Sequence, residues 1–477
     1  MVIADPHVLA PELMPEGEAL EAMMANQRKM IDLSPAAFEA LMDTAAAYRP
    51  DLLLIPGDIT KDGEAASHAW VAAHLQTLGI PALVIPGNHD LSAEVTDAAF
   101  DALYADFMGA IRDTESHSYV AEPFPGVTIL AIDGVRGNAG TGELSENTLN
   151  WLLAQADAAV AKGNLVIGMC HWQLMDHFDK QGSLESACQL KDAANIRDSL
   201  MQHGVHVVLT GHFHVNGITT YRNGSDSIME ITTGSPITFP CPYRLLTASK
   251  DRKTLQVETA YLSSLPEIDD LYTYSRSWMA VHAHDMIYQM APRVWSRVDE
   301  MKSKIAAQLG EAMTEQLMDC IPDTEEERIT LVDKHLGSTV VDLYLLHSEA
   351  NEPDHKEADS LAQALYTGMN NMIDEVLDAK PFIKYAIGGT IKSLANSMAQ
   401  EPLQSLVEDK TQWASESPDR TDDLMLYATI ANGYDPIQHR CENVNSRPSD
   451  AHKVLRHGQL YLIYKGHVYN VQGQKIQ

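Results

Sequence analysis

The stretch Val207-Val208-Leu209-Thr210-Gly211-His212-Phe213-His214 decides how the rest of the chain is interpreted. Its apolar, β-branched beginning predicts a buried strand, and Gly211 marks the end of that strand. His212 and His214 follow at once, and a neutral imidazole is a common metal ligand. Alone, a His-x-His pair more often consists of two solvated or singly hydrogen-bonded histidines. Its significance therefore depends on how the other strands of the chain end.

Earlier apolar runs also predict buried strands, and each run leads into polar residues. The runs are Met1–Ala4, Leu52–Ile55, Pro81–Ile85 and Leu165–Cys170. The polar residues after them are Asp5 and His7, then Asp58, then Asn88, His89 and Asp90, and finally His171. Predicted helices between strands indicate βαβ units. In such sheets ligand sites form beyond the carboxyl ends of the strands, which is where these side chains would gather.

The collected side chains offer nitrogen and oxygen donors and no thiolate. Seven of them are candidate ligands: Asp5, His7, Asp58, Asn88, His171, His212 and His214. Such donors suit Mn, Fe, Zn or Co ions rather than a structural zinc cage. Seven ligands are too many for one ion but suit two ions if one carboxylate bridges them. Two ions roughly 3.5–4 Å apart favour in-line displacement at phosphorus and generate hydroxide near neutral pH.

Charge and cysteine usage limit the possible functions. The 477-residue chain contains 34 basic and 66 acidic residues, a formal net charge of −32. Long nucleic acid is therefore disfavoured as a partner, because phosphate backbones are bound through Lys and Arg. A small phosphate substrate held by metal ions is compatible with this charge. The five cysteines form no Cys-x-x-Cys pair, and no apolar run reaches the roughly 18 residues of a membrane span.

The sequence pattern divides the chain into three regions. Residues 1–265 alternate predicted strands and helices and end in four short antiparallel strands. Residues 266–440 are rich in Ala, Leu, Met, Lys and Glu at helical spacing, which predicts a mostly helical accessory region. Residues 441–477 form a tail, in which a β-hairpin is predicted with its turn at Lys465-Gly466.

Helix starts and one insertion are predicted within the first region. Ser34-Pro35 is expected to open a helix as a capping residue followed by a first-turn proline. Further helices are predicted near Ser145 and over Ala93–Phe107. The Met- and Glu-rich segment Pro11–Asp32 leaves the expected site and returns to it. It could wall a pocket, and a solvated surface loop is an equally good interpretation.

Taken in order, the motifs resemble those of a known enzyme family. They are similar to the calcineurin-like metallophosphoesterases, and most to the group with class III cyclic-nucleotide phosphodiesterases, in Asp5-Pro6-His7, Gly57-Asp58, Gly87-Asn88-His89-Asp90, His171 and Gly211-His212-Phe213-His214. The segment Gly142-Glu143-Leu144-Ser145 resembles a stretch that these proteins have between motifs. The resemblance covers about residues 2–262. It implies an α/β (α+β) fold, a two-sheet β-sandwich core flanked by helices.

The resemblance also implies a role for each motif residue. Asp5, His7 and His214 would hold one metal ion, Asn88, His171 and His212 would hold a second, and Asp58 would bridge the two. His89 would be the general acid that protonates the leaving oxygen, and Asp90 would orient it. The implied reaction is hydrolysis of a small phosphodiester or phosphomonoester, nucleotide-like or a lipid headgroup. A hydroxide between two divalent or mixed-valence ions of the Mn, Fe or Zn class would attack phosphorus.

Substrate contacts are predicted from position along the chain. Tyr243 and Arg244 come soon after the last ligands and could join Asn88 and His89, with the arginine on a phosphate and the tyrosine stacked on a base. A kinked strand connection with a surface arginine explains the same segment at least as well. Weaker candidates of the same kind are Tyr119, His117 and Arg136.

Two alternatives stay open at this point. A metal-binding scaffold whose helical region carries the function is the alternative to an enzyme, although the His89-Asp90 pair favours catalysis. The apolar start of the chain, and a final hairpin similar to tails of exported bacterial proteins, favour an extracytoplasmic protein whose leader was removed. A cytoplasmic location is the alternative, and the number of subunits is not predicted.

Overall fold

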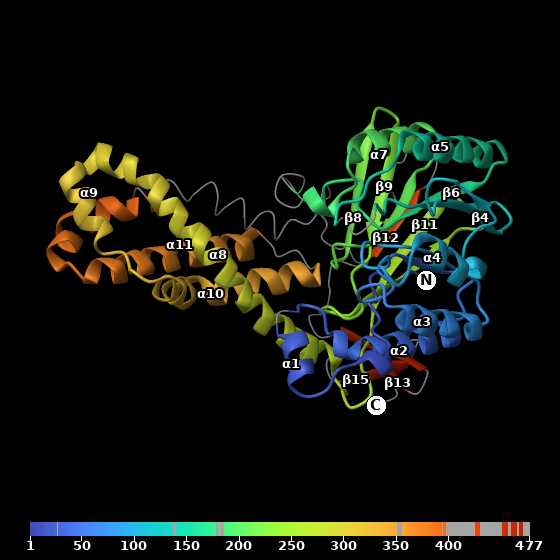
Figure 1. The fold of residues 1–477 in the computed structure, drawn as a ribbon, viewed down its shortest axis with the longest axis horizontal. Coiled ribbons are helices and arrows are strands. Elements are labelled where there is room, and N and C mark those ends of the chain that lie inside the picture. The colour runs from blue at the N-terminus through green and yellow to red at the C-terminus, as the bar shows by residue number, and fades with distance from the viewer. Residues whose placement is uncertain are drawn as a thin grey trace.

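The computed structural model describes residues 1–25, 27–136, 140–177, 181, 186–350, 355–393, 395–396, 425–429, 451–456, 459–464 and 467–470. These residues form a body of β-sheets flanked by helices, from which an arm of long helices extends (Figure 1). The mixed α/β body and the helical region after it confirm the fold class predicted from the sequence.

The larger sheet of the body has seven strands in the order β3-β4-β5-β6-β7-β9-β8. Its four central strands β5, β6, β7 and β9 run parallel, and the outer strands pair antiparallel. The bounds are β3 (Ile111–Arg112), β4 (Tyr119–Phe124), β5 (Val127–Ile132), β6 (Leu165–Cys170), β7 (Val207–Thr210), β8 (Gly217–Asn223) and β9 (Asp226–Thr232). The strand that leads to His171 (β6) and the strand that leads to His212 (β7) are therefore neighbours in the sheet.

The second sheet joins the start of the chain to much later strands. Val2 bridges in parallel to Leu54 of β1 and antiparallel to Arg244 of β10, so the first residues lie between these strands. The bounds are β1 (Leu53–Pro56), β2 (Ala82–Ile85), β10 (Pro242–Ala248), β11 (Thr254–Tyr261) and β12 (Met425–Thr429). Buried side chains of both sheets belong to one hydrophobic core. Strand β12 was not expected, because the sequence analysis assigned its residues to the helical region.

Helices cover the body on two sides, with α5 and α7 on the side opposite α2 and α3 (Figure 1). Helix α5 packs on β5 and β6, and α7 packs on β9. The bounds are α2 (Ser34–Tyr48), α3 (Ala65–Leu78), α4 (Asp97–Leu103), α5 (Glu146–Ala161) and α7 (Ala193–Gln202). Short turns of helix complete the body: η1 (Pro11–Leu13), α1 (Glu18–Met24), η2 (Ile31–Leu33), η3 (Ala105–Phe107) and η4 (Ser186–Cys188).

One predicted helix start is confirmed, and two others differ from the structure. Ser145 caps α5 as expected, because its side chain accepts a hydrogen bond from the Thr148 N–H. The capping role predicted for Ser34 is wrong. Its hydroxyl instead donates to the Ile31 carbonyl at 2.7 Å and accepts from the Leu9 N–H at 3.1 Å, so it ties the insertion to the first loop. The helix expected over Ala93–Phe107 begins only at Asp97 and breaks before η3.

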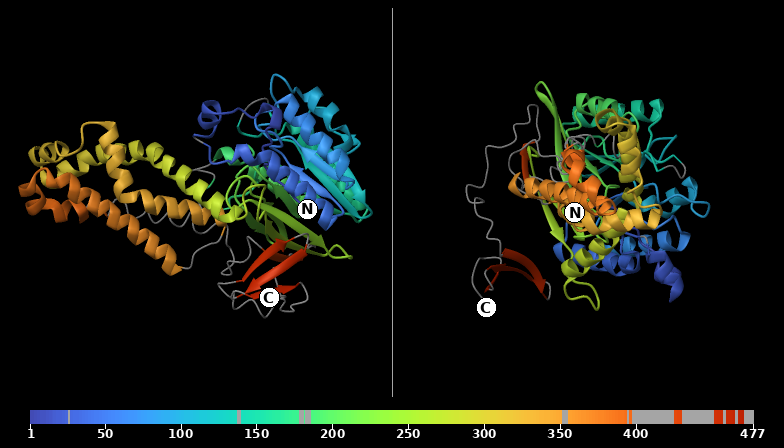
Figure 2. Two further views of the ribbon diagram at one scale, coloured as in Figure 1. Left: turned by 90° about the horizontal axis from the view of Figure 1, so that it is seen from below. Right: turned by 90° about the vertical axis from the view of Figure 1, so that its left-hand side faces the viewer.

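The arm consists of α8 (Leu271–Leu309), α9 (Glu311–Met318), α10 (Glu325–Glu349), α11 (His355–Asp378) and a helix that includes residues 381–393 (Figure 2). Helix α10 packs along both α8 and α11. The arm has its own apolar clusters, one of them around Trp295, Leu331 and Leu365. The predicted helical region is divided at Pro381, where a new helix begins after α11, because proline lacks the N–H that would continue a helix.

The tail forms a three-stranded antiparallel sheet of β13 (Ala451–Arg456), β14 (Gln459–Tyr464) and β15 (His467–Asn470). The predicted hairpin is confirmed by the pairing of β14 with β15, while its turn at Lys465-Gly466 lies outside the described residues. Across the described ranges, every helix is too short or too polar to cross a lipid bilayer.

Candidate metal centre

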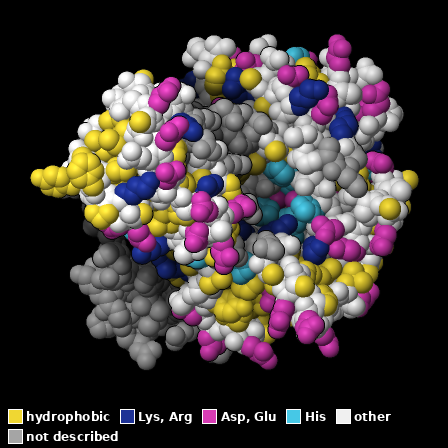
Figure 3. All heavy atoms as spheres, turned by 60° about the vertical axis from the view of Figure 1, so that its left-hand side comes forward, with side chains coloured by type: hydrophobic (Ala, Val, Ile, Leu, Met, Phe, Trp, Pro, Cys, Tyr) yellow, Lys and Arg dark blue, Asp and Glu magenta, His cyan; other side chains and the backbone are white. Residues whose placement is uncertain are grey.

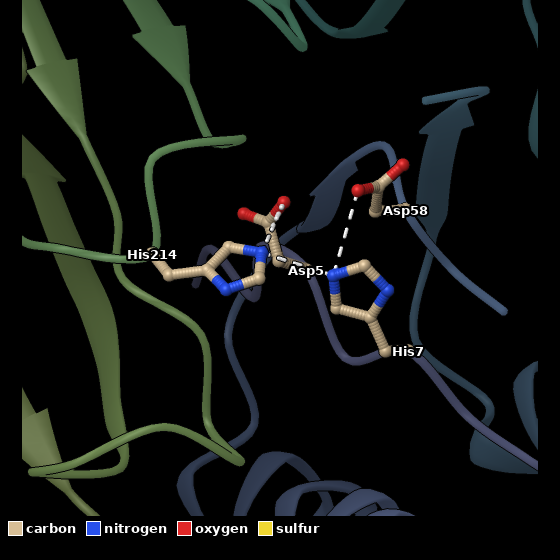
Figure 4. A group of neighbouring side chains, drawn as sticks. All are labelled: Asp5, His7, Asp58 and His214. Atoms are coloured by element: carbon tan, nitrogen blue, oxygen red, sulfur yellow. Dashed lines mark hydrogen bonds and ion pairs between the residues drawn. The ribbon is translucent and has the colours of Figure 1, made fainter. Parts of the chain in front are cut away.

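Side chains that are far apart in the sequence converge where the strands of the two sheets end. Asp5 and His7 follow the bridge residue Val2, Asp58 follows β1, and His214 follows β7. These four polar side chains point toward one another (Figure 4). Asp5, His7 and Asp58 are almost completely buried, which is costly for isolated polar groups and indicates a shared partner.

Two groups of ligand atoms form, and Asp58 belongs to both. The first group joins Asp5, His7, Asp58 and His214, and the second joins Asp58, His171 and His212. The Asp58 Oδ2 atom lies 3.4 Å from His7 Nε2, and its Oδ1 atom lies 3.4 Å from His171 Nε2. One carboxylate therefore offers one oxygen to each group, which is the arrangement required of a bridging ligand.

The remaining distances fit atoms that share an ion. His7 Nε2 and His214 Nε2 lie 3.0 Å apart, and His171 Nε2 and His212 Nδ1 lie 3.1 Å apart. Asn88 Oδ1 lies 3.1 Å from His171 Nε2, which places the seventh predicted ligand at the second group. Ligand bonds of about 2.0–2.2 Å put neighbouring ligand atoms about 3.0–3.5 Å apart. The donor set and its spacing therefore fit a metal-binding site.

The backbone at these residues is held in an unusual conformation. Five of the seven predicted ligands have positive φ angles: Asp5 (51°), His7 (42°), Asp58 (49°), His212 (67°) and His214 (64°). Residues with a Cβ atom adopt this region rarely and at a cost of order 1–3 kcal/mol each. The surrounding structure therefore holds the backbone in a strained conformation at the residues whose side chains converge.

Glycines let neighbouring loops approach the carboxylates. A Cβ atom at Gly87 would lie 2.2 Å from Asp58 Oδ1, and one at Gly211 would lie 2.5 Å from Asp5 Oδ2. Any other residue would displace these carboxylates or the loops that hold them. Gly87 and Gly211 therefore stand before Asn88 and His212 because a larger side chain would not fit there.

Hydrogen bonds fix the direction of the ligand atoms. The Pro56 carbonyl can only accept, so Nδ1 of His171, at 2.9 Å, carries a hydrogen and Nε2 faces the cluster. The backbone N–H of His212 donates to both oxygens of Asp5, at 2.9 and 3.0 Å. The histidine loop after β7 is therefore held by the first carboxylate of the chain.

Burial and charge set the protonation of the imidazoles. Burial lowers the pKa of His7 and His214, and burial together with the charge of His171 lowers the pKa of His212 to about 3. These three rings are therefore neutral, which is the form that binds metal. Burial also acts on His171, but Asp58 and Asp5 outweigh it and raise its pKa to about 9. Burial opposes ionisation of Asp58, yet His171 and His7 hold its pKa well below the usual value.

The predicted pairing of Asp90 with His89 is wrong. Both oxygens of the buried Asp90 carboxylate accept from the loop backbone, namely from the N–H groups of Ile59, Thr60 and Gly87 at 2.8–3.0 Å. Asp90 therefore clamps the loop after β1 to the loop after β2 and is not available to orient an imidazole.

The carboxylate beside His89 is that of Asp62, which the sequence analysis missed. The His89 Nδ1 atom lies 3.1 Å from Asp62 Oδ1, and the His89 ring packs edge-on against His7 with centroids 4.9 Å apart. Burial would lower the pKa of His89, but Asp62 and Asp58 raise it above the usual value. A signal was present, because Asp62 follows Asp58 by four residues in one loop.

A second residue that the motifs did not reveal is His68, which contacts the backbone of Asp90. It is fully buried, its Nε2 lies 2.9 Å from the Asp90 carbonyl oxygen, and its Nδ1 lies 2.9 Å from the Tyr104 hydroxyl. Through these contacts His68 links α3 to the loop after β2.

Two of the predicted substrate contacts, Tyr243 and Arg244, make other contacts in the structure. Arg244 is fully buried, and its guanidinium donates to the Thr232 carbonyl and the Thr259 hydroxyl. Tyr243 is half-buried, and burial, Glu258 and Tyr48 raise its pKa to about 12, which places it beside the end of α2. Of the three weaker candidates, Tyr119 lies in the core and donates a hydrogen bond to the Val84 carbonyl. His117 pairs with Asp97 and Asp101, and Arg136 is half-buried.

The arm touches the histidine loop. The ring of Phe213, between the two histidines of the loop, packs edge-on against His347 of α10 with centroids 5.5 Å apart. Val215 packs against Ala350 at the end of the same helix. The helical region is therefore in contact with a loop that carries two predicted ligands.

Known proteins resemble the first half of the chain. A probable cyclic nucleotide phosphodiesterase of Synechococcus sp. is 29% identical over 36% of this chain and 63% of its own length. A probable glycerophosphodiester phosphodiesterase of Arcobacter nitrofigilis is 27% identical over 39% and 64%. A solved dimetal phosphatase from Danio rerio aligns with 54% of this chain and 94% of its own, at 17% identity and a TM-score of 0.41. The chain thus spans less than two thirds of the first curated relatives it matches.

The family resemblance seen in the motifs is confirmed by a match to the family as a whole. Residues 1–216 match the family model of the calcineurin-like phosphoesterases. This range includes all seven predicted ligands, from Asp5 to His214. Over residues 1–216 this chain is therefore similar to the calcineurin-like phosphoesterases.

Proposed function

We propose that this protein hydrolyses small phosphoesters with two divalent metal ions. The observation that carries the proposal is the position of Asp58, whose two oxygens face two separate groups of ligand atoms. Asp5, His7 and His214 would hold one ion, and Asn88, His171 and His212 would hold the other. When bound, the ions would lower the pKa of water and neutralise the phosphoryl oxygens.

The residues of the chain would complete the chemistry around the phosphoryl group. His89 is partly exposed beside the cluster, and Asp62 and Asp58 favour its protonated form. It would therefore donate a proton to the leaving oxygen as the ester bond breaks. The names of the relatives support a small phosphodiester, such as a cyclic nucleotide or a glycerophosphodiester, and a phosphomonoester is the other substrate class that fits.

The three regions predicted from the sequence would have separate roles. Residues 1–265 would be the catalytic domain, residues 266–440 a helical accessory region, and residues 441–477 a tail. The separate apolar clusters of the arm support this division. An extracytoplasmic location stays a prediction, and cell fractionation would test it.

The experiment is metal analysis combined with hydrolysis of bis-p-nitrophenyl phosphate and p-nitrophenyl phosphate, with and without Mn²⁺. We expect about two ions per chain and Mn²⁺-dependent turnover. Asp58→Asn should lose both, whereas Asp106→Asn, a control on an exposed carboxylate, should lose neither. Turnover of Asp58→Asn in metal-free protein at the wild-type rate would refute the proposal.

A metal-binding scaffold is the second candidate, because the arm has its own core and contacts the histidine loop. A scaffold should bind ions at the same residues and show no Mn²⁺-dependent hydrolysis of either ester or of a panel of natural phosphoesters. The same measurement therefore separates the two functions.

A further inference from the structure

A buried carboxylate on β9 joins two loops of the metal centre. Glu230 is fully buried, and a polar group without access to water needs hydrogen-bond partners inside the protein. Its Oε2 atom accepts from the Leu174 N–H at 2.7 Å, and its Oε1 atom accepts from the Thr210 hydroxyl at 3.1 Å. The His177 Nε2 atom lies 2.9 Å from the same Oε1 atom. The two oxygens therefore bond segments that follow two different strands.

The bonds of Glu230 fall close to two predicted ligands. Leu174 follows His171 by three residues in the loop after β6. Thr210 ends β7 and stands two residues before His212. Both imidazoles belong to the second group of ligand atoms. The carboxylate therefore links the two loops that supply this group.

Further buried side chains extend this link into a network. The hydroxyl of Thr232, two residues after Glu230 on β9, lies 2.8 Å from the Thr210 hydroxyl. The side-chain amide of Gln173 donates to the Thr232 hydroxyl at 3.2 Å. All of these side chains are fully buried. A shift of either loop would break hydrogen bonds that no water replaces, so the network resists such a shift.

The first group of ligand atoms depends less on this network. Among the described residues, the Glu230 carboxylate hydrogen-bonds β7, β9 and the loop after β6, and not the loops that carry Asp5 and Asp58. His214 shares a loop with His212, but Asp5 also holds that loop, through two hydrogen bonds from the His212 N–H. A change at Glu230 should therefore act mainly on the second group.

We propose that Glu230 is a positioning residue for the second metal ion, because it holds His171 and His212 at the spacing that one ion requires. Their ligand atoms, Nε2 and Nδ1, lie 3.1 Å apart, as neighbouring ligands of one ion do. Figure 3 shows histidine side chains in a hollow near the centre of one face. Glu230 has no exposed surface, so it does not touch a substrate there. The inference rests on the proposed function for the assignment of both imidazoles to one ion.

The test compares Glu230→Gln with Asp133→Asn, a matched control. Asp133 is also a buried carboxylate, and it accepts from the N–H groups of His117 and Val135 at 3.0 and 2.8 Å. Calorimetry would measure the affinity for each Mn²⁺ ion, and hydrogen exchange of β6 and β7 would measure stability. Glu230→Gln should weaken one ion about tenfold, the lower end of the effect of groups that orient metal ligands, and the other less than about twofold. Asp133→Asn should lose stability and change neither affinity by more than about twofold.

A ligand variant identifies which ion is affected. His212→Ala removes a ligand of the second group, so adding Glu230→Gln to it should change the affinity for the remaining ion by less than about twofold. Thr210→Val removes one hydroxyl from the network and is the milder variant if Glu230→Gln does not fold. It should weaken the second ion about two- to fivefold.

Three results would overturn the inference: wild-type affinity for both ions in Glu230→Gln, an equal loss of affinity in Asp133→Asn, or an equal weakening of both ions. Binding of fewer than two ions by the wild type would overturn the inference and the proposed function together. Two ions bound by the wild type without Mn²⁺-dependent hydrolysis would refute the proposed function alone. A selective loss of one ion in Glu230→Gln would then still support the positioning role.

Discussion

The substitution Asp90→Asn should destabilise the body by about 2–5 kcal/mol, whereas Asp62→Asn should change its stability by less than about 0.5 kcal/mol. The Asp90 carboxylate is fully buried and accepts four hydrogen bonds of 2.8–3.1 Å. Two come from Ile59 and Gly87 to one oxygen, and two come from Thr60 to the other. The Asp62 side chain is 55% exposed and bonds only neighbouring side chains.

The magnitude follows from counting donors that lose their acceptor. Asparagine keeps one oxygen and turns an amide NH₂ group toward the remaining two donors. Each buried donor left without a partner costs about 1–3 kcal/mol, and partial relaxation keeps the total below the simple sum. If the Thr60 hydroxyl rotates to accept from the new amide, the loss falls toward the lower limit.

Hydrogen exchange of the metal-free protein would measure this loss locally. Peptides from β1 and β2 report the opening of the body even if the arm unfolds separately. The urea dependence of their exchange gives the free energy of opening for each variant. A loss below about 0.5 kcal/mol in Asp90→Asn, or an equal loss in Asp62→Asn, would refute the conclusion that Asp90 clamps the two loops.

Two further predictions concern the metal centre. Metal binding at pH 7 should release a proton, because carboxylates raise the pKa of His171 to about 9 and a ligand imidazole must be neutral. The apparent affinity should therefore rise from pH 6 to pH 9, and calorimetry in two buffers would count the protons. Gly87→Ala should lower metal affinity at least about tenfold, because its Cβ would lie 2.2 Å from Asp58 Oδ1; elemental analysis after dialysis checks this.

Strand positions were predictable because each central strand is a continuous apolar run. The runs at 52–55, 81–85, 165–170 and 207–210 all became buried strands within one residue or two of their predicted bounds. A parallel strand covered on both faces needs apolar residues at every position, so its signal is strong and local. Strand β12 also lies in an apolar run, but that run falls in a region interpreted as helical, and its pairing with β11 joins residues about 170 positions apart.

The partners of the site residues were less predictable than the residues themselves. Motif order identified Asp58 and His89, but the family resemblance implied Asp90 as the partner of His89, and the fold turns that carboxylate toward backbone N–H groups. Arg244 shows the same limit. Its position soon after the histidine loop suggested a substrate contact, yet its strand directs it into the core.

The sequence by itself determined which residue types end each strand, and with them the donor chemistry of the centre. This is local information, because a strand end and its polar residues are neighbours along the chain. Only the tertiary structure decided that Asp58 faces two groups of ligands and that Asp62 pairs with His89. These relations depend on how separate loops approach one another in space, and the spacing of the residues along the chain does not encode that distance.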